Sequence, residues 1–394
     1  MELNAIQAEL RDKKLDGWLF YDFHNRDPIA ARVLNMDTSR FASRRWYYFI
    51  PSQGEPKKLV HRIEPWRCDH LPGERMIYLS WQQQQQLLQT ILKECRQIAM
   101  QYSPQNAIPY VSIVDAGTIE LIRSFGVDVV SSADLVGRFE AHLSMEDWRS
   151  HQEAGRILQM VKDETFRHVV RRVKNGERPK EVEIQSWMHD LMHKNDLHWE
   201  DGPIVAVNEH AADPHFEPTS ENSFHIKEGD LLLLDLWAKK NISGSIYYDI
   251  TWMAFLGKSV PFELETIFQV LVSARNTALT TVRESFSAGK ALYGWQVDDA
   301  CRNVVSQAGY GDAFTHRTGH NIGEEVHGNG VHIDNLETKD ERQILPGTCF
   351  SIEPGIYLPE RKIGFRSEID VFVTDDGKVE VTGAIQERII PLLA

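Results

Sequence analysis

The chain has 394 residues, with 43 lysines and arginines against 57 aspartates and glutamates, and a formal net charge of −14. This acidic excess argues against nucleic acid as a main partner, because phosphate binding needs a basic surface. The 42% hydrophobic and 25% charged fractions are ordinary for a globular protein, and the length is sufficient for two domains.

The N-terminal segment MELNAIQAELRDKKLDGWLF is charged throughout and lacks the apolar core of a signal peptide. No run approaches the roughly 18 apolar residues that a membrane span requires. The four cysteines are too scattered for a metal motif and too few for a disulfide framework. We therefore expect a cytoplasmic protein with reduced thiols and no membrane partner.

Residues 1–142 alternate helical and strand patterns, as expected of an α/β domain. NAIQAELRDKKL has helical spacing, LDGWLFYDF is typical of a strand, and RRWYYFIPSQGEPKKLVHRI predicts a hairpin that turns at residues 53–54. WQQQQQLLQTILKECRQIAMQ predicts a helix, since Leu87, Leu88 and Ile91 recur at helical spacing. NAIPYVSIV and VDVVSS predict further strands.

A second domain is expected over residues 145–394, after a boundary near residues 142–145. Ser144 is a suitable N-cap, with Asp147 three residues on, for a long helix over Met145–Lys174. Further helices are predicted in EVEIQSWMHDLMHKN and over residues 266–287 and 297–308. We expect these helices to lie outside a set of mostly antiparallel strands, so the predicted class is α+β.

Four carboxylates lie inside runs that otherwise predict buried strands: Asp235 in LLLLDLWA, Asp249 in SIYYDITWMAF, Glu353 in SIEPGIY and Glu368 in FRSEIDVFV. The period of two places Asp235 on the face of Trp237 and Asp249 on the face of Tyr247 and Thr251. Such carboxylates are costly to bury unless a cation pairs with them. Oxygen ligands with one imidazole suit Mn²⁺, Zn²⁺, Co²⁺ or Fe²⁺, and four converging charges favour two cations over one.

The ordered set resembles the ligand set of the M24 metallopeptidases of pita-bread fold, which include aminopeptidase P, prolidase and methionine aminopeptidase. The residues that carry the resemblance are Asp235, Asp249, His320 in GHNIG, Glu353 and Glu368. The resemblance covers residues 145–394, and the first half is similar to the creatinase-type N-terminal domain of prolidases and aminopeptidase P. It implies two divalent metal ions per chain, with Mn²⁺ favoured, and a homodimer.

The resemblance also implies a role for each ligand. Asp249 and Glu368 are expected to bridge the two ions, Asp235 to hold one of them, and His320 with Glu353 to hold the other. Glu353 is in addition the expected acceptor of a proton from the attacking water.

Further residues receive catalytic or substrate-binding roles by the same resemblance. His215 in the DPHF loop and His327 are expected to bind substrate and to stabilise the developing oxyanion. His316 and Arg366 are expected to support catalysis from beside the ligands. His332 is a further expected substrate contact.

The implied reaction is hydrolysis of the peptide bond before proline in small peptides. We expect a small apolar pocket to select the proline ring, with Phe216, Tyr248 or Trp252 as its walls. Trp252 stands where an arginine is common in the family, so the sequence departs from the family pattern at this position. The departure concerns packing or substrate contacts and not the metal ligands.

The segment between His327 and Glu353 is longer than in typical aminopeptidase P enzymes and carries His332, Lys339 and Arg342. A cationic group there would meet the free carboxylate of a dipeptide. We therefore predict an Xaa-Pro dipeptidase (prolidase), with an Xaa-Pro aminopeptidase (aminopeptidase P) acting on longer peptides as the alternative.

Three other functions are known for proteins that resemble this fold, and the ligand set distinguishes between them. A metal-dependent lyase is compatible with the ligands. A creatinase-like amidinohydrolase uses no metal, and the histone-chaperone relatives that act as binding modules tend to have lost the ligands. The complete set of five ligands disfavours both of these.

Overall fold

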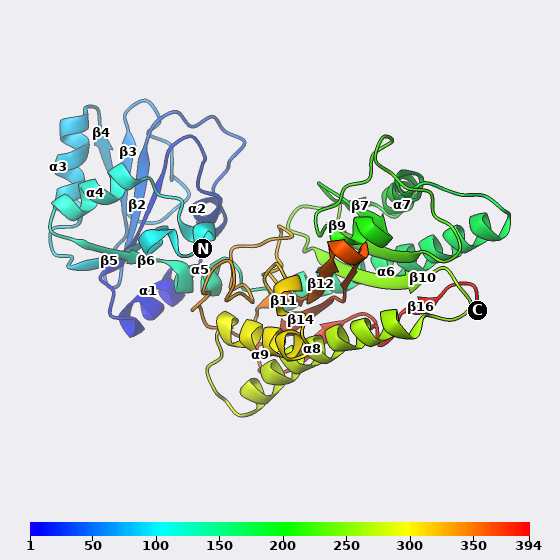
Figure 1. The fold of residues 1–394 in the computed structure, drawn as a ribbon. Coiled ribbons are helices and arrows are strands. Elements are labelled where there is room, and N and C mark those ends of the chain that lie inside the picture. The colour runs from blue at the N-terminus through cyan, green and yellow to red at the C-terminus, as the bar shows by residue number, and fades with distance from the viewer. The chain divides into compact units, whose positions relative to one another are not determined.

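The computed structural model describes residues 1–394, which divide into two units, Met1–Glu140 and Ala141–Ala394 (Figure 1). The first unit is built on a six-stranded sheet of order β4-β3-β2-β1-β5-β6. Its strands are β1 (Gly17–Asp22), β2 (Trp46–Pro51), β3 (Lys57–His61), β4 (Glu74–Tyr78), β5 (Gln97–Met100) and β6 (Asp128–Ser131). Its helices are α1 (Leu3–Asp12), α2 (Pro28–Val33), α3 (Trp81–Ile91), α4 (Ala116–Ser124) and α5 (Ala133–Phe139).

Both faces of this sheet are covered by helices. Trp18 and Phe20 of β1 pack into a core with α1, α2 and α5, whereas Leu19 between them packs into a second core with α3 and α4. The alternation of side chains along one strand therefore supplies both cores.

Several predicted elements of this unit are confirmed, and two are wrong. The hairpin is confirmed, since β2 and β3 pair antiparallel with Tyr47 opposite Leu59. The helix predicted over residues 81–101 ends at Ile91, because the apolar run Gln97–Met100 pairs instead with β1 and β6 as strand β5. The strand predicted in NAIPYVSIV is absent: one 3₁₀ turn, Pro104–Asn106, ends at its first residue, and a second, Pro109–Val111, lies within it, each opened by a proline.

The second unit begins with a long capped helix. Ser144 accepts a hydrogen bond from the Asp147 backbone while the Asp147 side chain accepts from the Ser144 backbone, which confirms the predicted cap. The helices of the unit are α6 (Met145–Lys174), α7 (Glu181–Lys194), α8 (Phe262–Ser287) and α9 (Gly294–Gln307). Its strands are β7 (Leu197–His198), β8 (Ile204–Val207), β9 (Leu231–Lys240), β10 (Tyr248–Phe255), β11 (Cys349–Ile352), β12 (Gly355–Leu358), β13 (Ile363–Arg366), β14 (Ile369–Val373), β15 (Val379–Thr382) and β16 (Ile390–Pro391).

Strands β9 and β10 form the centre of this unit, in a sheet of order β16-β10-β9-β7 with β8 also paired to β9. Leu232, Leu234 and Leu236 pack on one face of the sheet with α6 and α7. Leu231 and Leu233 pack on the other face with α8, α9 and strands β11 to β14.

Smaller sheets lie against this second face. Strands β11, β14 and β15 form one, strands β12 and β13 another, and both are antiparallel. The predicted α+β class is confirmed. No helix of the structure is long and apolar enough to cross a membrane.

Candidate metal centre

Strands β9 and β10 place the two candidate aspartates on one face. The strands pair antiparallel, with Thr251 opposite Asp235 and Trp237 opposite Asp249. Neighbouring residues of each strand point to the opposite face, into the core with α6 and α7. Asp235 and Asp249 are both buried, with 7% and 5% of their surface exposed.

Glu368 reaches the same place from the connection between β13 and β14. It is 2% exposed, and its Oε2 accepts a hydrogen bond from the Thr251 hydroxyl at 2.7 Å. Behind it, the buried Arg275 of α8 donates to the Ser367 hydroxyl at 2.7 Å and to the Gln386 carbonyl at 2.6 Å. These contacts tie the Glu368 segment to helix α8.

His320 is positioned by backbone contacts with β11. Its backbone N–H donates to the Ser351 hydroxyl at 3.0 Å, and its carbonyl accepts from the Ser351 N–H at 2.9 Å. The neighbouring Gly319 has no room for a side chain, because a Cβ there would overlap the Ser351 carbonyl oxygen. A glycine at this position is therefore required by close backbone approach.

Helix α9 supports the histidine segment from the other side. Asp298 is fully buried and accepts hydrogen bonds from the Thr318 N–H at 2.9 Å and the Asn335 N–H at 3.1 Å. Arg302 lies one turn along the helix and donates to the carbonyls of Phe314 and His316. The ion pair between Asp298 and Arg302 of α9 thus fixes the segment that carries His316 and His320.

Three of the five predicted ligands converge. One ligand atom from each of Asp249, His320 and Glu368 lies within 4.8 Å of the others. Glu353, which is half-buried, places its Oε1 3.2 Å from His320 Nε2, and Asp249 Oδ2 lies 3.6 Å from the same nitrogen. Asp235 is instead paired with the Arg366 guanidinium.

The chemistry of this set fits divalent cations. Asp249 Oδ1 and Glu368 Oε1 are buried and have no hydrogen-bond partner. Burial raises the pKa of Asp249 to about 7 and the pKa of Glu368 well above its usual range. Buried carboxylate oxygens without a donor are the ligands that a hard or borderline cation needs, and the positive charge of that cation would favour the ionised form of both carboxyl groups.

His320 balances the carboxylates in this structure. Burial alone would lower its pKa, but hydrogen bonds to Asp249 and Glu353 raise the pKa of His320 to about 9. The same contact lowers the pKa of Glu353, although burial opposes its ionisation. The imidazole therefore already occupies a position of strong negative potential.

A residue that the sequence reasoning missed connects the two sides of the site. The Tyr357 hydroxyl accepts from Arg366 Nη1 at 2.9 Å and lies 2.7 Å from His316 Nε2. Because His316 Nδ1 lies 2.7 Å from the Arg317 carbonyl, that nitrogen carries the hydrogen and Nε2 accepts from the tyrosine. Burial lowers the pKa of His316 to about 4, which keeps the ring neutral.

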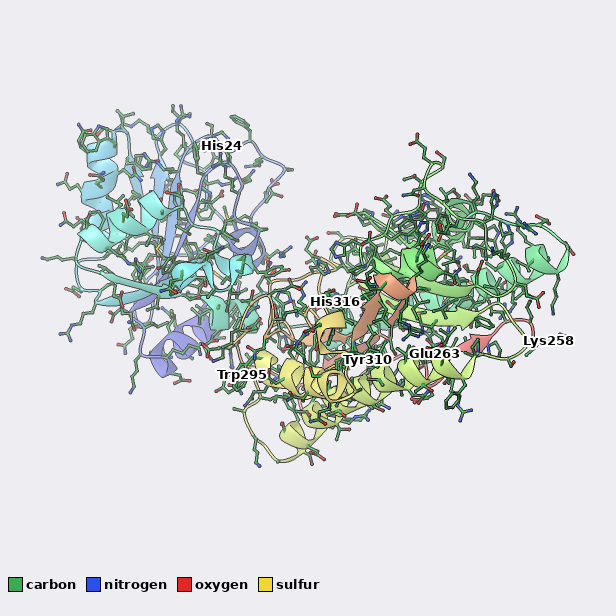
Figure 2. All side chains as sticks on the ribbon, in the orientation of Figure 1. His24, Lys258, Glu263, Trp295, Tyr310 and His316 are labelled. Carbon is green, nitrogen blue, oxygen red and sulfur yellow. The ribbon has the colours of Figure 1, made fainter.

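Arg366 completes this network. Its Nε donates to the Thr251 hydroxyl at 3.0 Å, while its Nη groups meet Tyr357 and Asp235. Arg366 is buried, with 4% of its surface exposed. A buried arginine with three directed contacts orients its partners, as expected of a group beside metal ligands. His316 is labelled in Figure 2.

The other predicted histidines take different places. His215 and His327 are exposed, and the His327 ring lies 4.3 Å from the His320 ring in an edge-to-face arrangement. His332 is 3% exposed, and its Nδ1 accepts from the Asn321 N–H at 3.0 Å. We expected His332 to contact substrate. Its burial and its contact with the Asn321 backbone instead favour a structural role, in which it holds the loop in place.

The expectation for the proline pocket is wrong at two of three positions. Tyr248 and Trp252 face the core with α6 and α7, opposite to Asp249. The Trp252 indole is covered by the buried Lys162, whose Nζ lies 3.4 Å from the ring centroid. Phe216 lies in the core on the site's side of the sheet and stacks on His210 at 4.0 Å.

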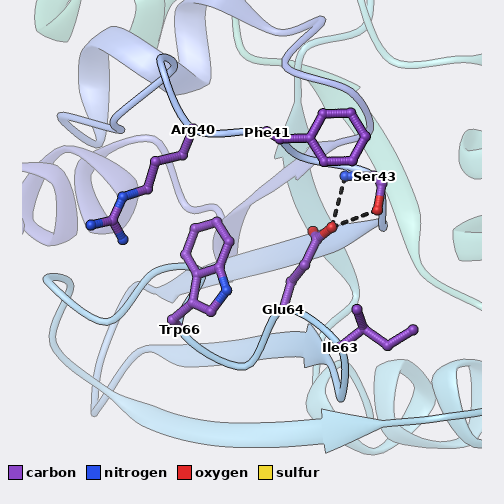
Figure 3. Close-up of a pocket in the computed structure, with 6 residues that line it drawn as sticks. All are labelled: Arg40, Phe41, Ser43, Ile63, Glu64 and Trp66. Atoms are coloured by element: carbon purple, nitrogen blue, oxygen red, sulfur yellow. Dashed lines mark hydrogen bonds between the residues drawn. The ribbon is translucent and has the colours of Figure 1, made fainter.

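A pocket of about 540 Å³ in the first unit contains none of the predicted site residues. It is lined by Arg40, Phe41, Ser43, Ile63, Glu64 and Trp66 (Figure 3). Within it, the Glu64 carboxylate accepts from the Ser43 N–H at 2.8 Å and the Ser43 hydroxyl at 2.6 Å.

Comparison with known proteins gives a family match. The model of metallopeptidase family M24 matches residues 149–375, more than half of the chain. The protein named "Probable dipeptidase PepE" from Mycobacterium tuberculosis is 32% identical over 187 residues, which cover 48% of this chain and 45% of that protein. The chain thus spans less than half the length of the first curated relatives that it matches.

Two further similarities extend over more of the chain. The protein named "Xaa-Pro dipeptidase" from Pyrococcus furiosus is 24% identical over 284 residues, covering 67% of this chain and 75% of that protein. The crystal structure of dipeptidase PepE from Mycobacterium ulcerans superposes with a TM-score of 0.71 at 21% identity, covering 99% of this chain and 96% of that one. At that identity the superposition shows a shared fold.

Proposed function

This chain belongs to metallopeptidase family M24, and from that premise we propose that it hydrolyses the peptide bond before proline with two divalent cations. The observation that carries the proposal is the convergence of Asp249, His320 and Glu368 within 4.8 Å, together with buried carboxylate oxygens that lack a donor. The second unit has the pita-bread fold of this family, and the site lies on its central strands.

Five residues would hold the cations: Asp235, Asp249, His320, Glu353 and Glu368. Bound divalent cations supply Lewis acidity, which polarises a carbonyl oxygen and makes water acidic enough to ionise near neutral pH. Mn²⁺ is the cation that we favour for this oxygen-rich set, with Zn²⁺, Co²⁺ and Fe²⁺ as alternatives.

The chain's own residues provide the remaining functions. Glu353 is half-buried, with its Oε1 3.2 Å from His320 Nε2, and its carboxylate is the group that we propose accepts a proton from the attacking water. His327, whose ring lies 4.3 Å from the His320 ring, and the exposed His215 are the donors that we propose for the scissile carbonyl or its developing oxyanion. His316, Tyr357 and Arg366 hold the Asp235 side of the site in one arrangement.

We propose Xaa-Pro dipeptides as the preferred substrates, supported by the dipeptidase names of the similar proteins. One structural observation favours the alternative, an Xaa-Pro aminopeptidase. Arg342 is buried, donates to both carboxylate oxygens of Asp340 and to the Asn329 carbonyl, and so is committed within the loop. Lys339, the remaining cation of that segment, is exposed and pairs with Glu341 at 2.7 Å.

Hydrolysis assays with added Mn²⁺ separate these functions. An Xaa-Pro dipeptide, the same dipeptide amidated at its C-terminus, an Xaa-Pro-Yaa tripeptide and an Xaa-Ala dipeptide would be compared. We expect the Xaa-Pro dipeptide to be cleaved fastest, and a charge-assisted contact to its carboxylate to give roughly a 10-fold advantage or more over the amide. Equal or faster cleavage of the tripeptide would establish the aminopeptidase instead, and preference for Xaa-Ala would refute both.

The resemblance to prolidases also leads us to propose a homodimer as the active form. Sedimentation at the concentrations of the assay measures this directly. If the protein is a monomer and still prefers dipeptides, the residues that select substrates by their length lie within the second unit itself.

A further inference from the structure

The edge of strand β10 that carries Asp249 is held by side chains, not by a neighbouring strand. On one side β10 pairs with β9 along its whole length, but on the other side β16 begins only at Ala254. Three side chains cover the stretch before it. Asp370 accepts from the Asp249 N–H at 2.8 Å, Glu368 accepts from the Thr251 hydroxyl at 2.7 Å, and Gln386 accepts from the Met253 N–H at 2.9 Å.

Of these three side chains, Asp370 is the one whose burial is least favourable for the stability of the fold. It is fully buried, and its Oδ1 has no hydrogen-bond partner. It also lies near the negative charges of Asp249 and Glu353. A buried carboxylate of this kind lowers stability relative to an apolar side chain of similar size, so a purely structural role explains it poorly.

The position of Asp370 suggests what it contributes. It follows Glu368 by two residues, so one short segment supplies both a candidate metal ligand and the acceptor for the backbone of another. His151 of α6 closes the space behind it, with Nε2 3.8 Å from Asp370 Oδ2. The ring is itself held by the Tyr247 carbonyl at 2.6 Å, the Thr382 hydroxyl at 2.9 Å and the indole of Trp148.

We propose that Asp370 is a positioning residue for the metal centre. Its carboxylate oxygen holds the Asp249 backbone, and this sets the distance between the side chains of Asp249 and Glu368. The inference rests on the proposed function, because it takes these two residues as metal ligands. It extends that function by assigning the metal affinity in part to a residue that does not touch the metal.

Two variants separate positioning from charge and from packing. Asp370→Asn keeps an oxygen acceptor for the Asp249 N–H without the charge, whereas Asp370→Leu keeps the approximate volume without any acceptor. Asp230→Ala is the matched control, because Asp230 is also buried and accepts a backbone hydrogen bond, from the Lys227 N–H at 2.9 Å, away from the site. Binding of Co²⁺ to metal-free protein would be measured by equilibrium dialysis, and thermal melting would be followed in parallel.

We expect Asp370→Leu to weaken Co²⁺ binding by about 10- to 100-fold, the usual effect of losing a partner behind a metal ligand. Its metal-free form should still unfold cooperatively, because the leucine fills the approximate volume of the aspartate, although the Asp249 N–H then lacks its acceptor. Asp370→Asn should bind Co²⁺ nearly as the parent does, and Asp230→Ala should melt lower with unchanged affinity. If the leucine variant does not fold, Asp370→Ala takes its place under the same criteria.

Each contrary result has a distinct meaning. Parent-like Co²⁺ affinity in Asp370→Leu overturns the inference and leaves the proposed function intact. Equal weakening in Asp370→Asn shows that the charge acts, which also overturns positioning. Absence of Co²⁺ binding in the parent overturns the proposed function itself.

Discussion

His320 and His327 lie beside each other but differ in what surrounds them. His320 is buried between Asp249 and Glu353, whereas His327 is exposed, and the two rings meet edge to face with 4.3 Å between their centroids. We predict that His320→Ala loses bound metal. His327→Ala should keep its metal and lose on the order of 10²-fold in kcat, if it donates to the oxyanion.

Metal analysis and steady-state kinetics on the two variants decide between these roles. The reverse pattern, with metal lost from the His327 variant and kept by the His320 variant, would exchange the assignments. Equal activity of His327→Ala and the parent would remove His327 from catalysis.

At the residue scale, the sequence indicated the ionisable groups that converge, Asp249, His320 and Glu368, but not the neutral Tyr357 that connects His316 with Arg366. Carboxylates inside apolar runs are unusual enough to be recognised, and the order of the five ligands added a family resemblance. Only Asp235 and Asp249 lie within strands, whereas Glu353 and Glu368 lie in the connections that follow β11 and β13. Tyr357 was missed because a tyrosine in a strand is typical of core packing. Tyr248 and Trp252 were misplaced although the period of two already set them opposite to Asp249.

The GHNIG segment shows how a single element depends on close backbone approach. A side chain at Gly319 would overlap the Ser351 carbonyl, whereas nothing lies near a Cβ placed on Gly323. We predict that Gly319→Ala moves His320 away from β11, lowers the melting temperature and weakens metal binding by 10-fold or more, about 1.4 kcal/mol.

Gly323→Ala is the matched control within the same segment, and it should change neither property measurably. Melting curves with and without Mn²⁺ test the pair. Parent-like behaviour of Gly319→Ala would mean that the close contact with β11 is not needed to place His320.

At the element scale, local signals succeeded where they were strong. The Ser144 cap, the hairpin of β2 and β3 and the antiparallel site strands were predicted from turn residues and alternation. Strand β5 was missed because the helical spacing of α3 runs directly into it, and only pairing with β1 and β6 decides its conformation. The partners that select such a strand are distant in sequence, so local patterns do not reveal them.

For the whole molecule, the clustered carboxylates predict a stability that depends on both metal and pH. Burial raises the pKa of Asp249 from 3.8 to about 7. A carboxyl group with a higher pKa in the folded state stabilises the fold while protonated, and this contribution is lost as the pH rises from about 4 through about 7. The metal-free protein should therefore melt progressively lower across this window.

Added Mn²⁺ binds the ionised carboxylates and offsets the cost of burying their charge, so the gain in melting temperature on adding metal should be larger at about pH 8 than at about pH 5. Melting curves with Mn²⁺ and with chelator at both pH values measure the gain. A gain that is equal at the two pH values, or absent at about pH 8, would show that these carboxylates do not meet a common cation.

The most direct measurement of the central claim is a calorimetric titration of Mn²⁺ into the metal-free chain, beside the same titration of Asp249→Asn. We predict that the parent binds two equivalents per chain, and that the variant loses most of this binding together with cleavage before proline, because we propose that Asp249 is a ligand of both cations. Parent-like stoichiometry and affinity in Asp249→Asn, or a parent that binds no Mn²⁺, would contradict the account.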